Sequence, residues 1–387
     1  MKYRKGCKIL KLRKDQVGID GESDTEKIAL KVFYGEFVFG DLWFSHKDIG
    51  TGTNIELADL IINIGNDLLA FQIKTRKEVS LSLETGDKKW VAKQIKKAKD
   101  QLVDTFHNIQ VEGLPGFVNQ RGDSIFLEKG GIFSGIIILK NERVLEYPKI
   151  ISCNRLQGIL HCFTEKDFNI CCERLVIPKD ILSYLYFRER YYKVDQEVEE
   201  KEEICLSKFL ISKYGTEFFD NSFIESFKWI INHYKERLIE ENKGSTEYRE
   251  IIQVLAMLDR MEIDTFTNIF LKLLNGAQEG IYTDHMFMKS ANEHKHSILF
   301  ISQKILDRKH ANRVTQLFMY KSKVEKCLTV ILCLEDEMNF EVDWLLLEYP
   351  WEKDAGMERM IEELGIQNKW IPKKILTGKY VDRKESL

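Results

Sequence analysis

The sequence has 387 residues, of which 44% are hydrophobic, so it can form two or three domains with their own cores and is not a disordered chain. Its net charge of −3 excludes a globally basic protein, so contacts with nucleic acid would depend on local basic patches. No apolar run approaches the roughly 20 residues that cross a bilayer, and the scattered cysteines contain no C-x-x-C pair; we expect a cytoplasmic protein with reduced thiols.

The N-terminal region predicts a helix that begins near residue 23. Residues 1–20 alternate basic and apolar side chains, as in an edge strand or a basic arm. Ser23 and Glu26 then have the spacing of a capping box, and the apolar residues up to Phe33 fit one helix face. Glu26 is therefore either a capping residue or an inward-facing acid that could add an oxygen to a metal site.

A β-hairpin is the clearest feature of the sequence, and it follows a short strand expected within residues 40–50. The apolar runs 60–64 and 68–73 are separated by the tripeptide Gly-Asn-Asp at 65–67. These residues supply the positive φ and the self-capping side chains of a tight turn.

Three polar side chains stand at the open end of this hairpin. Asp59 opens the first strand, while Gln72 and Lys74 alternate with Ile73, so the pleat places Gln72 and Lys74 on one face. Their convergence would give an oxygen-ligand site for Mg²⁺ with a cation beside it. A lysine within an apolar strand is costly without a partner, which favours a functional interpretation. The alternative is an amphipathic hairpin whose Lys74 simply reaches solvent.

A long amphipathic helix is predicted over residues 88–106. Its apolar residues, from Trp90 to Phe106, recur at three- and four-residue spacing, and lysines occupy much of the other side. Beside a metal site, these cations would suit a phosphate backbone, and the candidates are Lys89, Lys93, Lys96, Lys97 and the nearby Arg76. A solvated helix face is the alternative. Gln94 and Gln101 lie on one side of this helix, and either could lean toward the site.

The pattern after this helix completes an α/β domain. Residues 135–139 form a continuous apolar run typical of a buried central strand, and residues 151–193 fit a further strand and a helix. The order is helix, three strands, helix, strand, which is an α/β core with one hairpin and a helical crossover. The acidic stretch 195–203 marks the best boundary, so the first domain is expected to span 1–193.

The remaining region, 194–387, is predicted to be mainly α-helical. Apolar residues recur at three- and four-residue spacing through most of 204–320, including 297–305. A strand is expected over 328–334, followed by a short tail helix. This region shows no recognisable chemistry and no internal repeat, so sensing, oligomerisation or partner binding is the expected role.

The hairpin and its neighbours resemble the PD-(D/E)XK nuclease superfamily, and in particular its Mrr-like branch, in which glutamine replaces the second acid to give D…QxK. The resemblance rests on Asp59 and on Gln72-Ile73-Lys74, and it covers roughly residues 20–190. It implies a restriction-endonuclease-like αβββαβ core that uses Mg²⁺ or Mn²⁺. One departure is Ala58, which stands where the family name has proline.

The resemblance also implies roles for single residues. Asp59 corresponds to the metal-binding acid, Gln72 replaces the second acid, and Lys74 corresponds to the catalytic lysine. Glu26 corresponds to the acid of the first helix. The metal would then be held by Asp59, the Ile73 carbonyl, and Glu26 or Gln72.

The implied activity is hydrolysis of phosphodiester bonds by a metal-dependent endonuclease, most simply on DNA, as in restriction and anti-phage defence. A second hypothesis is an inactive nuclease fold that binds nucleic acid or a protein partner; the neutral Gln72 favours it, whereas Asp59 and Lys74 oppose it. A third, a structural helical partner protein, requires the hairpin to be a coincidence.

Overall fold

The computed structural model describes residues 16–45, 54–76, 84–112, 114–119, 124–127, 131–141, 144, 146–156, 158–194, 200–216, 221–241, 246–282, 286–289, 296–334 and 340–363. The expectations for residues 1–15 lie outside this set. The chain divides into two compact units, Met1–Asn221 with Ile239–Arg260, and Ser222–Leu238 with Met261–Leu387. Among the described helices, none is both long and apolar enough to cross a bilayer.

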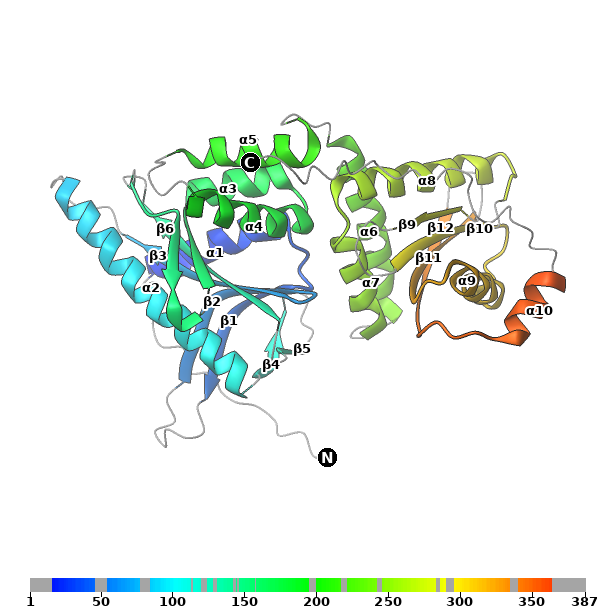
Figure 1. The fold of residues 1–387 in the computed structure, drawn as a ribbon, viewed down its shortest axis with the longest axis horizontal. Helices are drawn as coiled ribbons and strands as arrows, with labels where there is room; N and C mark the ends of the chain where they lie inside the picture. The colour runs from blue at the N-terminus through cyan, green and yellow to red at the C-terminus, as the bar shows by residue number, and fades with distance from the viewer. Residues whose placement is uncertain are drawn as a thin grey trace. The chain divides into compact units, whose positions relative to one another are not determined.

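The first unit is built on a six-stranded mixed sheet with the order β1-β2-β3-β6-β8-β7 (Figure 1). Its strands are β1 (Val38–Ser45), β2 (Asn54–Ile64), β3 (Asp67–Thr75), β6 (Ile132–Lys140), β7 (Ile150–Cys153) and β8 (Gly158–Thr164). Strands β1 to β3 form an antiparallel meander, whereas β3, β6 and β8 run parallel. A separate pair is formed by β4 (Leu114–Val118) and β5 (Ser124–Leu127).

The predicted hairpin is confirmed as β2 and β3. Gly65 adopts a φ of 58°, the left-handed conformation that glycine reaches without strain, and it begins the turn. The two strands pair in an antiparallel register in which Ile61 of β2 lies opposite Ala70 of β3. The central strand predicted at 135–139 is also confirmed, because β6 pairs with β3 on one side and with β8 on the other.

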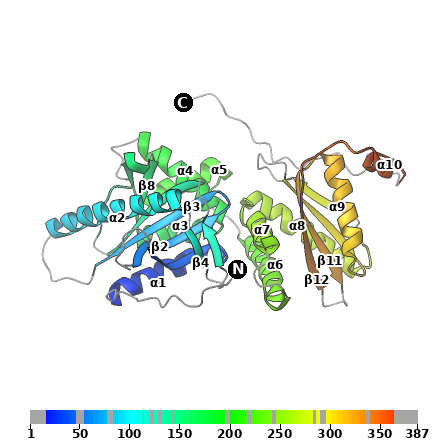
Figure 2. The same ribbon diagram turned by 90° about the horizontal axis from the view of Figure 1, so that it is seen from below.

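Helices cover both faces of this sheet. The helices of this unit are α1 (Gln16–Leu30), α2 (Glu84–Glu112), α3 (Glu165–Leu175), α4 (Pro178–Val194), α5 (Glu202–Tyr214) and α7 (Thr246–Ala256). Leu68 and Ala70 of β3 share a buried cluster with Leu102 of α2, whereas the Phe71 ring contacts Phe168 of α3. Because successive strand residues point to opposite faces, α2 covers one face and α3 the other. Figure 2 shows α1 and α2 on opposite sides of the sheet.

The predicted start of the first helix is wrong. Within the described residues α1 already begins at Gln16, so Ser23 lies in the helix interior and does not cap it. The Thr25 hydroxyl donates instead to the Gly21 carbonyl one turn earlier. A serine followed three residues later by glutamate is a frequent pattern, and it does not by itself establish a helix start. The interpretation of Glu26 as a capping residue therefore falls.

Helix α7 returns to the first unit after a segment that belongs to the second. Its buried Tyr248 donates a hydrogen bond to Glu36 Oε1 (2.6 Å), and the Glu36 carbonyl accepts a bond from Asn119 (3.1 Å). Glu36 is 1% exposed and lies between α1 and β1. The pKa of the neighbouring Tyr34 is raised by burial and by the Glu36 charge. Helix α7 therefore completes the packing around a buried carboxylate.

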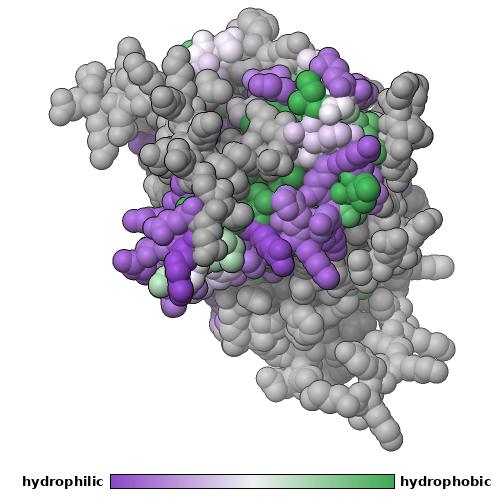
Figure 3. Space-filling model, turned by 90° about the vertical axis from the view of Figure 1, so that its right-hand side faces the viewer, coloured by the Kyte–Doolittle hydropathy of each residue, from purple (hydrophilic) through white to green (hydrophobic). Residues whose placement is uncertain are grey.

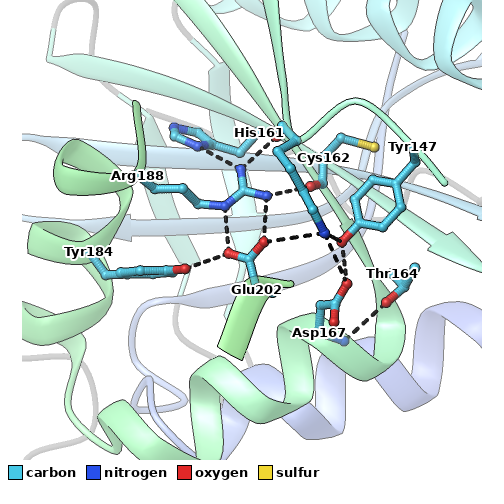
Figure 4. A network of polar contacts seen from close by, with 9 residues as sticks. Tyr147, His161, Cys162, Thr164, Asp167, Tyr184, Arg188 and Glu202 are labelled. Atoms are coloured by element: carbon cyan, nitrogen blue, oxygen red, sulfur yellow. Dashed lines mark hydrogen bonds and ion pairs between the residues drawn. The ribbon is translucent and has the colours of Figure 1, made fainter. Parts of the chain in front are cut away.

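A buried ion pair joins α4, α5 and the sheet (Figure 4). Arg188 of α4 is fully buried, and its Nε and Nη2 donate to Glu202 at 2.6 and 3.0 Å. The same guanidinium donates to the Lys149 and Cys162 carbonyls at 2.6 and 2.7 Å. The adjacent His161 has its pKa lowered to about 3, first by burial and then by Arg188. Glu202, although part of the acidic stretch, is an internal residue.

The second unit contains a four-stranded sheet with the order β12-β11-β10-β9. Its strands are β9 (Met286–Lys289), β10 (His296–Gln303), β11 (Lys326–Leu334) and β12 (Phe340–Glu348). Its helices are α6 (Ser222–Glu241), α8 (Arg260–Gln278), α9 (Arg308–Ser322) and α10 (Ala355–Glu363). The last residues of α6, after Leu238, and the first residue of α8 belong to the first unit. Strands β10 and β11 are parallel and are connected through α9. The Phe266 ring contacts Phe300 and Trp344 from the sheet.

This sheet corrects the expectation of a mainly helical region. Helices occupy the middle of the chain, but residues 297–305 fall largely on β10, not on a helix. Periodicity alone does not separate a short buried apolar run in a strand from one in a helix. The strand predicted at 328–334 is confirmed as part of β11, and the short tail helix as α10.

Candidate functional site

The hairpin brings Asp59, Gln72 and Lys74 together at its open end. Gln72 and Lys74 continue the alternation of Leu68 and Ala70, so they lie on the face of β3 that α2 covers. Asp59 follows Leu57 and Ala58 in β2, just before the first residue of β2 that pairs with β3.

Hydrogen bonds fix these side chains in one arrangement. The Ile73 N–H donates to Asp59 Oδ2 (2.6 Å), which orients the carboxylate. Lys74 Nζ donates to Gln72 Oε1 (2.7 Å) and to the Ile73 carbonyl (3.3 Å), and it lies 3.7 Å from Asp59 Oδ2. Exposure is 9% for Asp59, 1% for Gln72 and 8% for Lys74, so Lys74 does not simply reach solvent. Such burial of a cation requires the oxygens that surround it.

Two further acids complete an acidic cluster around Asp59. Glu22 of α1, Glu56 of β2 and Asp59 each offer a carboxylate oxygen, and these oxygens lie within 4.8 Å of one another. The first-helix acid in this cluster is Glu22, one turn before the expected Glu26. Glu26 lies four residues later on the same face of this helix, and its assignment as a metal-binding acid stays a prediction.

A β-bulge explains why Glu56 was missed. Trp43 pairs with Glu56 and Leu42 with Ala58, so Leu57 is an extra residue in β2. In a regular strand, residues three apart point to opposite faces, but one extra residue reverses the alternation. Glu56 and Asp59 therefore reach the same cluster. The sequence gives no signal for this bulge.

The donor set of this cluster fits a divalent cation. Carboxylate oxygens are the ligands that Mg²⁺ and Mn²⁺ prefer, and three such groups this close together repel one another without a counter-charge. Glu22, Glu56 and Asp59 are the residues that could hold the ion. Gln72 Oε1 instead accepts a hydrogen bond from Lys74, which makes Gln72 a positioning residue for the ammonium.

Contacts at the carboxyl ends of β3 and β6 hold the turn of α1 that carries Glu22. Lys140, the last residue of β6, contacts Asp24 Oδ2 (2.5 Å) and Glu165 Oε1 (3.0 Å). Its hydrogen bond lowers the pKa of Asp24. Gly21 lies against Thr75, the last residue of β3, so closely that a side chain at position 21 would meet the threonine hydroxyl.

Replacing Gly21 by alanine should destabilise the first unit. The added Cβ would lie 2.2 Å from Thr75 Oγ1, and relief of such overpacking costs about 1–3 kcal/mol, which exceeds the gain of about 1 kcal/mol from helix propensity. Urea denaturation measures the change. Gly276→Ala in α8, where the nearest atom would be 3.4 Å away, is the control and should not destabilise. Gly21→Ala combined with Thr75→Ala should recover stability, and its failure to do so would contradict the clash.

Cations gather on the N-terminal half of α2. Lys89, Lys93, Lys96 and Lys97 are exposed, and none of them forms an ion pair with another described residue. The Arg76 guanidinium lies 5.8 Å from the centre of the Trp90 ring. Two other lysines of α2 are engaged, Lys88 with Glu146 (2.7 Å) and Lys99 with the Ser152 carbonyl (3.0 Å). Gln94 and Gln101 are half-buried, and neither has a recorded contact with Asp59 or Lys74.

Comparison of the chain with protein-family models, with curated proteins and with solved structures finds no match. The chemistry of the site therefore follows from its own residues. Three carboxylates offer a place for a divalent cation, and a buried ammonium beside them can bind an anion. A phosphate group satisfies both requirements at once.

Proposed function

We propose that the first unit is a metal-dependent endonuclease of the PD-(D/E)XK type that hydrolyses phosphodiester bonds in DNA. The observation that carries this proposal is the buried Lys74 ammonium, held 3.7 Å from Asp59 beside an acidic cluster. The Mrr-like D…QxK pattern places the same residue types in the same order. The order α1, β1, β2, β3, α2, β6 also agrees with a restriction-endonuclease-like core.

In this proposal the protein residues act as a rigid frame for the reacting phosphate. A Mg²⁺ or Mn²⁺ ion held by Glu22, Glu56 and Asp59 would supply positive charge at the scissile phosphate and lower the pKa of an attacking water. The Ile73 N–H keeps the Asp59 carboxylate in place, so little reorganisation is needed when substrate binds. All of these groups come from the hairpin and α1.

Lys74 would stabilise the negative charge that develops on the phosphate oxygens. Its ammonium donates to Gln72 Oε1 and to the Ile73 carbonyl, and these two bonds fix its position beside Asp59. The carboxylate of Asp59 lies 3.7 Å away as a counter-charge, so we assign Lys74 an electrostatic role and not that of a free base.

The exposed lysines of α2 would bind the substrate backbone next to this site. Lys89, Lys93, Lys96 and Lys97 offer cations that are not neutralised by described carboxylates, as a phosphate-binding surface requires. Arg76 continues directly from β3 beyond Lys74. These contacts would position any sequence equally, since they reach phosphates and not base edges.

Cleavage by the purified full chain tests the proposal. Plasmid DNA, linear duplex DNA and RNA are incubated with Mg²⁺, Mn²⁺ or a chelator, beside the Asp59→Asn variant. We expect metal-dependent cleavage of DNA that the chelator and Asp59→Asn both abolish. Asp104→Asn, at an exposed acid of α2, is the matched control and should cleave normally. Cleavage that survives both the chelator and Asp59→Asn would overturn the assignment.

Metal binding distinguishes Glu22 from Glu26. Glu22→Gln and Glu56→Gln should each weaken Mn²⁺ binding at least about tenfold. Loss of a residue that only orients a metal ligand commonly costs that much, and loss of a ligand itself should cost no less. Glu26→Gln should bind nearly as well as the wild type, since the acidic cluster includes Glu22 and not Glu26. Isothermal titration calorimetry measures all three. A loss confined to Glu26→Gln would restore the original assignment of the first-helix acid.

A second candidate is a nuclease fold that binds nucleic acid or a protein partner without cutting. The observation in its favour is Gln72, a neutral amide whose oxygen is bonded to Lys74. Calorimetry separates the two candidates, because a purely binding module should show no Mg²⁺ or Mn²⁺ binding that depends on Asp59.

A further inference from the structure

Helix α9 of the second unit carries basic residues towards both of its ends. It contains no acidic residue, although the chain as a whole has more acidic than basic residues. Its cationic residues, together with the residue that ends it, are Arg308, Lys309, Arg313, Lys321 and Lys323. Figure 3 shows the side of the chain on which α9 and α10 lie, where hydrophilic side chains cover much of the described surface.

Helix stability explains only the cations at the C-terminal end. Lys321 and Lys323 lie where the helix dipole is negative, so they stabilise α9. Lys309 lies in the first turn, where the dipole is positive and a cation is unfavourable by about 0.3–1 kcal/mol, whereas Arg313 lies in the second turn, where the dipole has little effect. A basic N-terminal half therefore has no local structural reason.

The acids beside this end of the helix are engaged first by other groups, although the pKa of Asp307 is lowered first by the His310 N–H and also by the Lys309 charge. The Asp307 carboxylate caps the helix by accepting the Lys309 and His310 N–H groups, each at 3.0 Å. Asp343 is paired with Arg308 at 3.0 Å. Lys309 and Arg313 are exposed, and neither forms an ion pair with another residue that the structure describes.

Four of the exposed residues of α9 and its C-cap form one line, which we call the α9 ridge: Lys309, Arg313, Gln316 and Lys323. Their spacings keep the first three on one face, while Ala311, Val314 and Phe318 are buried in the core on the other side. At 1.5 Å per residue, the ridge extends over about 21 Å. That length corresponds to about six base pairs of duplex at 3.4 Å per pair.

The ridge has the character of a nucleic-acid surface and not of a protein interface. Protein interfaces have an apolar or aromatic centre, but no large hydrophobic residue of α9 is exposed. Near its end, Lys323 lies 5.2 Å from the ring of Trp351, which also contacts Tyr320. Cations in line with a partly exposed aromatic pair are typical of surfaces that follow a phosphate backbone.

We propose that the α9 ridge is a second nucleic-acid-binding surface, which contacts the phosphate backbone of the polymer that the first unit acts on. The identification of the partner as this polymer depends on the proposed function. The assignment of the ridge as a binding surface depends only on the charges and exposures of α9. The second unit would then hold substrate by contacts that are independent of sequence.

Binding measured without divalent cations tests the ridge separately from cleavage. The full chain is titrated against labelled duplex DNA, single-stranded DNA and RNA of equal length over a range of salt concentrations. The variant Lys309→Ala/Arg313→Ala removes two cations. We expect its plot of log affinity against log salt to be shallower by about 2, or about 1 for each lost phosphate contact, and its affinity at low salt to fall in proportion.

Controls make every outcome decisive. Lys166→Ala/Lys272→Ala, at exposed lysines on α3 and α8, removes the same charge elsewhere and should leave the salt slope unchanged. A wild-type slope in the ridge variant, or no binding of any nucleic acid by the wild type, overturns the inference. If the ridge variant loses affinity but the wild type never cleaves, the inference stands and the proposed activity falls. The three polymers identify which nucleic acid is bound.

Discussion

Replacing Lys74 by alanine should lower the rate of phosphodiester cleavage by roughly a hundredfold to a thousandfold, the range found when one preorganised charge-stabilising donor is removed. Metal affinity should change little, because Lys74 is no ligand and the carboxylates of Glu22, Glu56 and Asp59 remain. The effect therefore differs from that of Asp59→Asn, which should abolish cleavage through the loss of the metal. Single-turnover cleavage assays and calorimetry on the same preparation separate the two effects.

Gln72→Ala is the informative partner variant. It removes the oxygen that holds the Lys74 ammonium at 2.7 Å but leaves the charge, so the rate should fall by less than in Lys74→Ala. Lys27→Ala, at an exposed lysine of α1, is a control for lost charge. Unaltered cleavage in Lys74→Ala would remove the electrostatic role and with it the main support for the proposed activity.

Replacing Glu202 by alanine should reduce the free energy of unfolding of the first unit by about 3–5 kcal/mol. The substitution leaves the Arg188 guanidinium in the core without its counter-charge, and breaking a buried pair from one side commonly costs this much. Tyr184 would also lose its acceptor, since its hydroxyl donates to Glu202 Oε1 at 2.5 Å. Urea denaturation, with hydrogen exchange in peptides from α4 and α5, measures the loss.

A neighbouring acid provides the matched control for this prediction. Glu200 is two residues earlier in the chain and pairs with Lys208 at 2.9 Å on the surface. Water and salt screen such a pair, so Glu200→Ala should leave the unfolding transition unchanged. Equal effects of the two variants would show that burial does not determine the contribution of Glu202.

Local pattern predicted the elements that carry the candidate site and placed Asp59 in it, but it did not predict that Glu22 and Glu56 lie beside Asp59. The turn residues and apolar runs gave the hairpin, and the three- and four-residue spacing gave α2. Glu22 was missed because the helix start was placed too late, and Glu56 because a bulge at Leu57 changes the strand alternation. Both depend on contacts with residues distant in sequence, such as that between Gly21 and Thr75.

Long-range pairing also explains the errors outside the site. The acidic stretch that includes Glu202 is typical of a domain boundary or a solvated helix start; α5 does begin at Glu202, but the side chain is buried against Arg188. The apolar run in β10 is short enough to fit either a helix or a strand, and its pairing with β11 decides between them. In both cases the deciding partner comes from another element of the fold.

The return of α7 has a consequence for how the chain can be divided. Because 239–260 belong to the first unit while 222–238 belong to the second, the two units are interlaced along the polypeptide, and no single cut separates them. A fragment that ends at Asn221 would lack Tyr248 and leave the Glu36 carboxylate without that donor in an opened core. A fragment meant to contain the whole first unit therefore has to continue to Arg260 and includes residues 222–238 of the second unit.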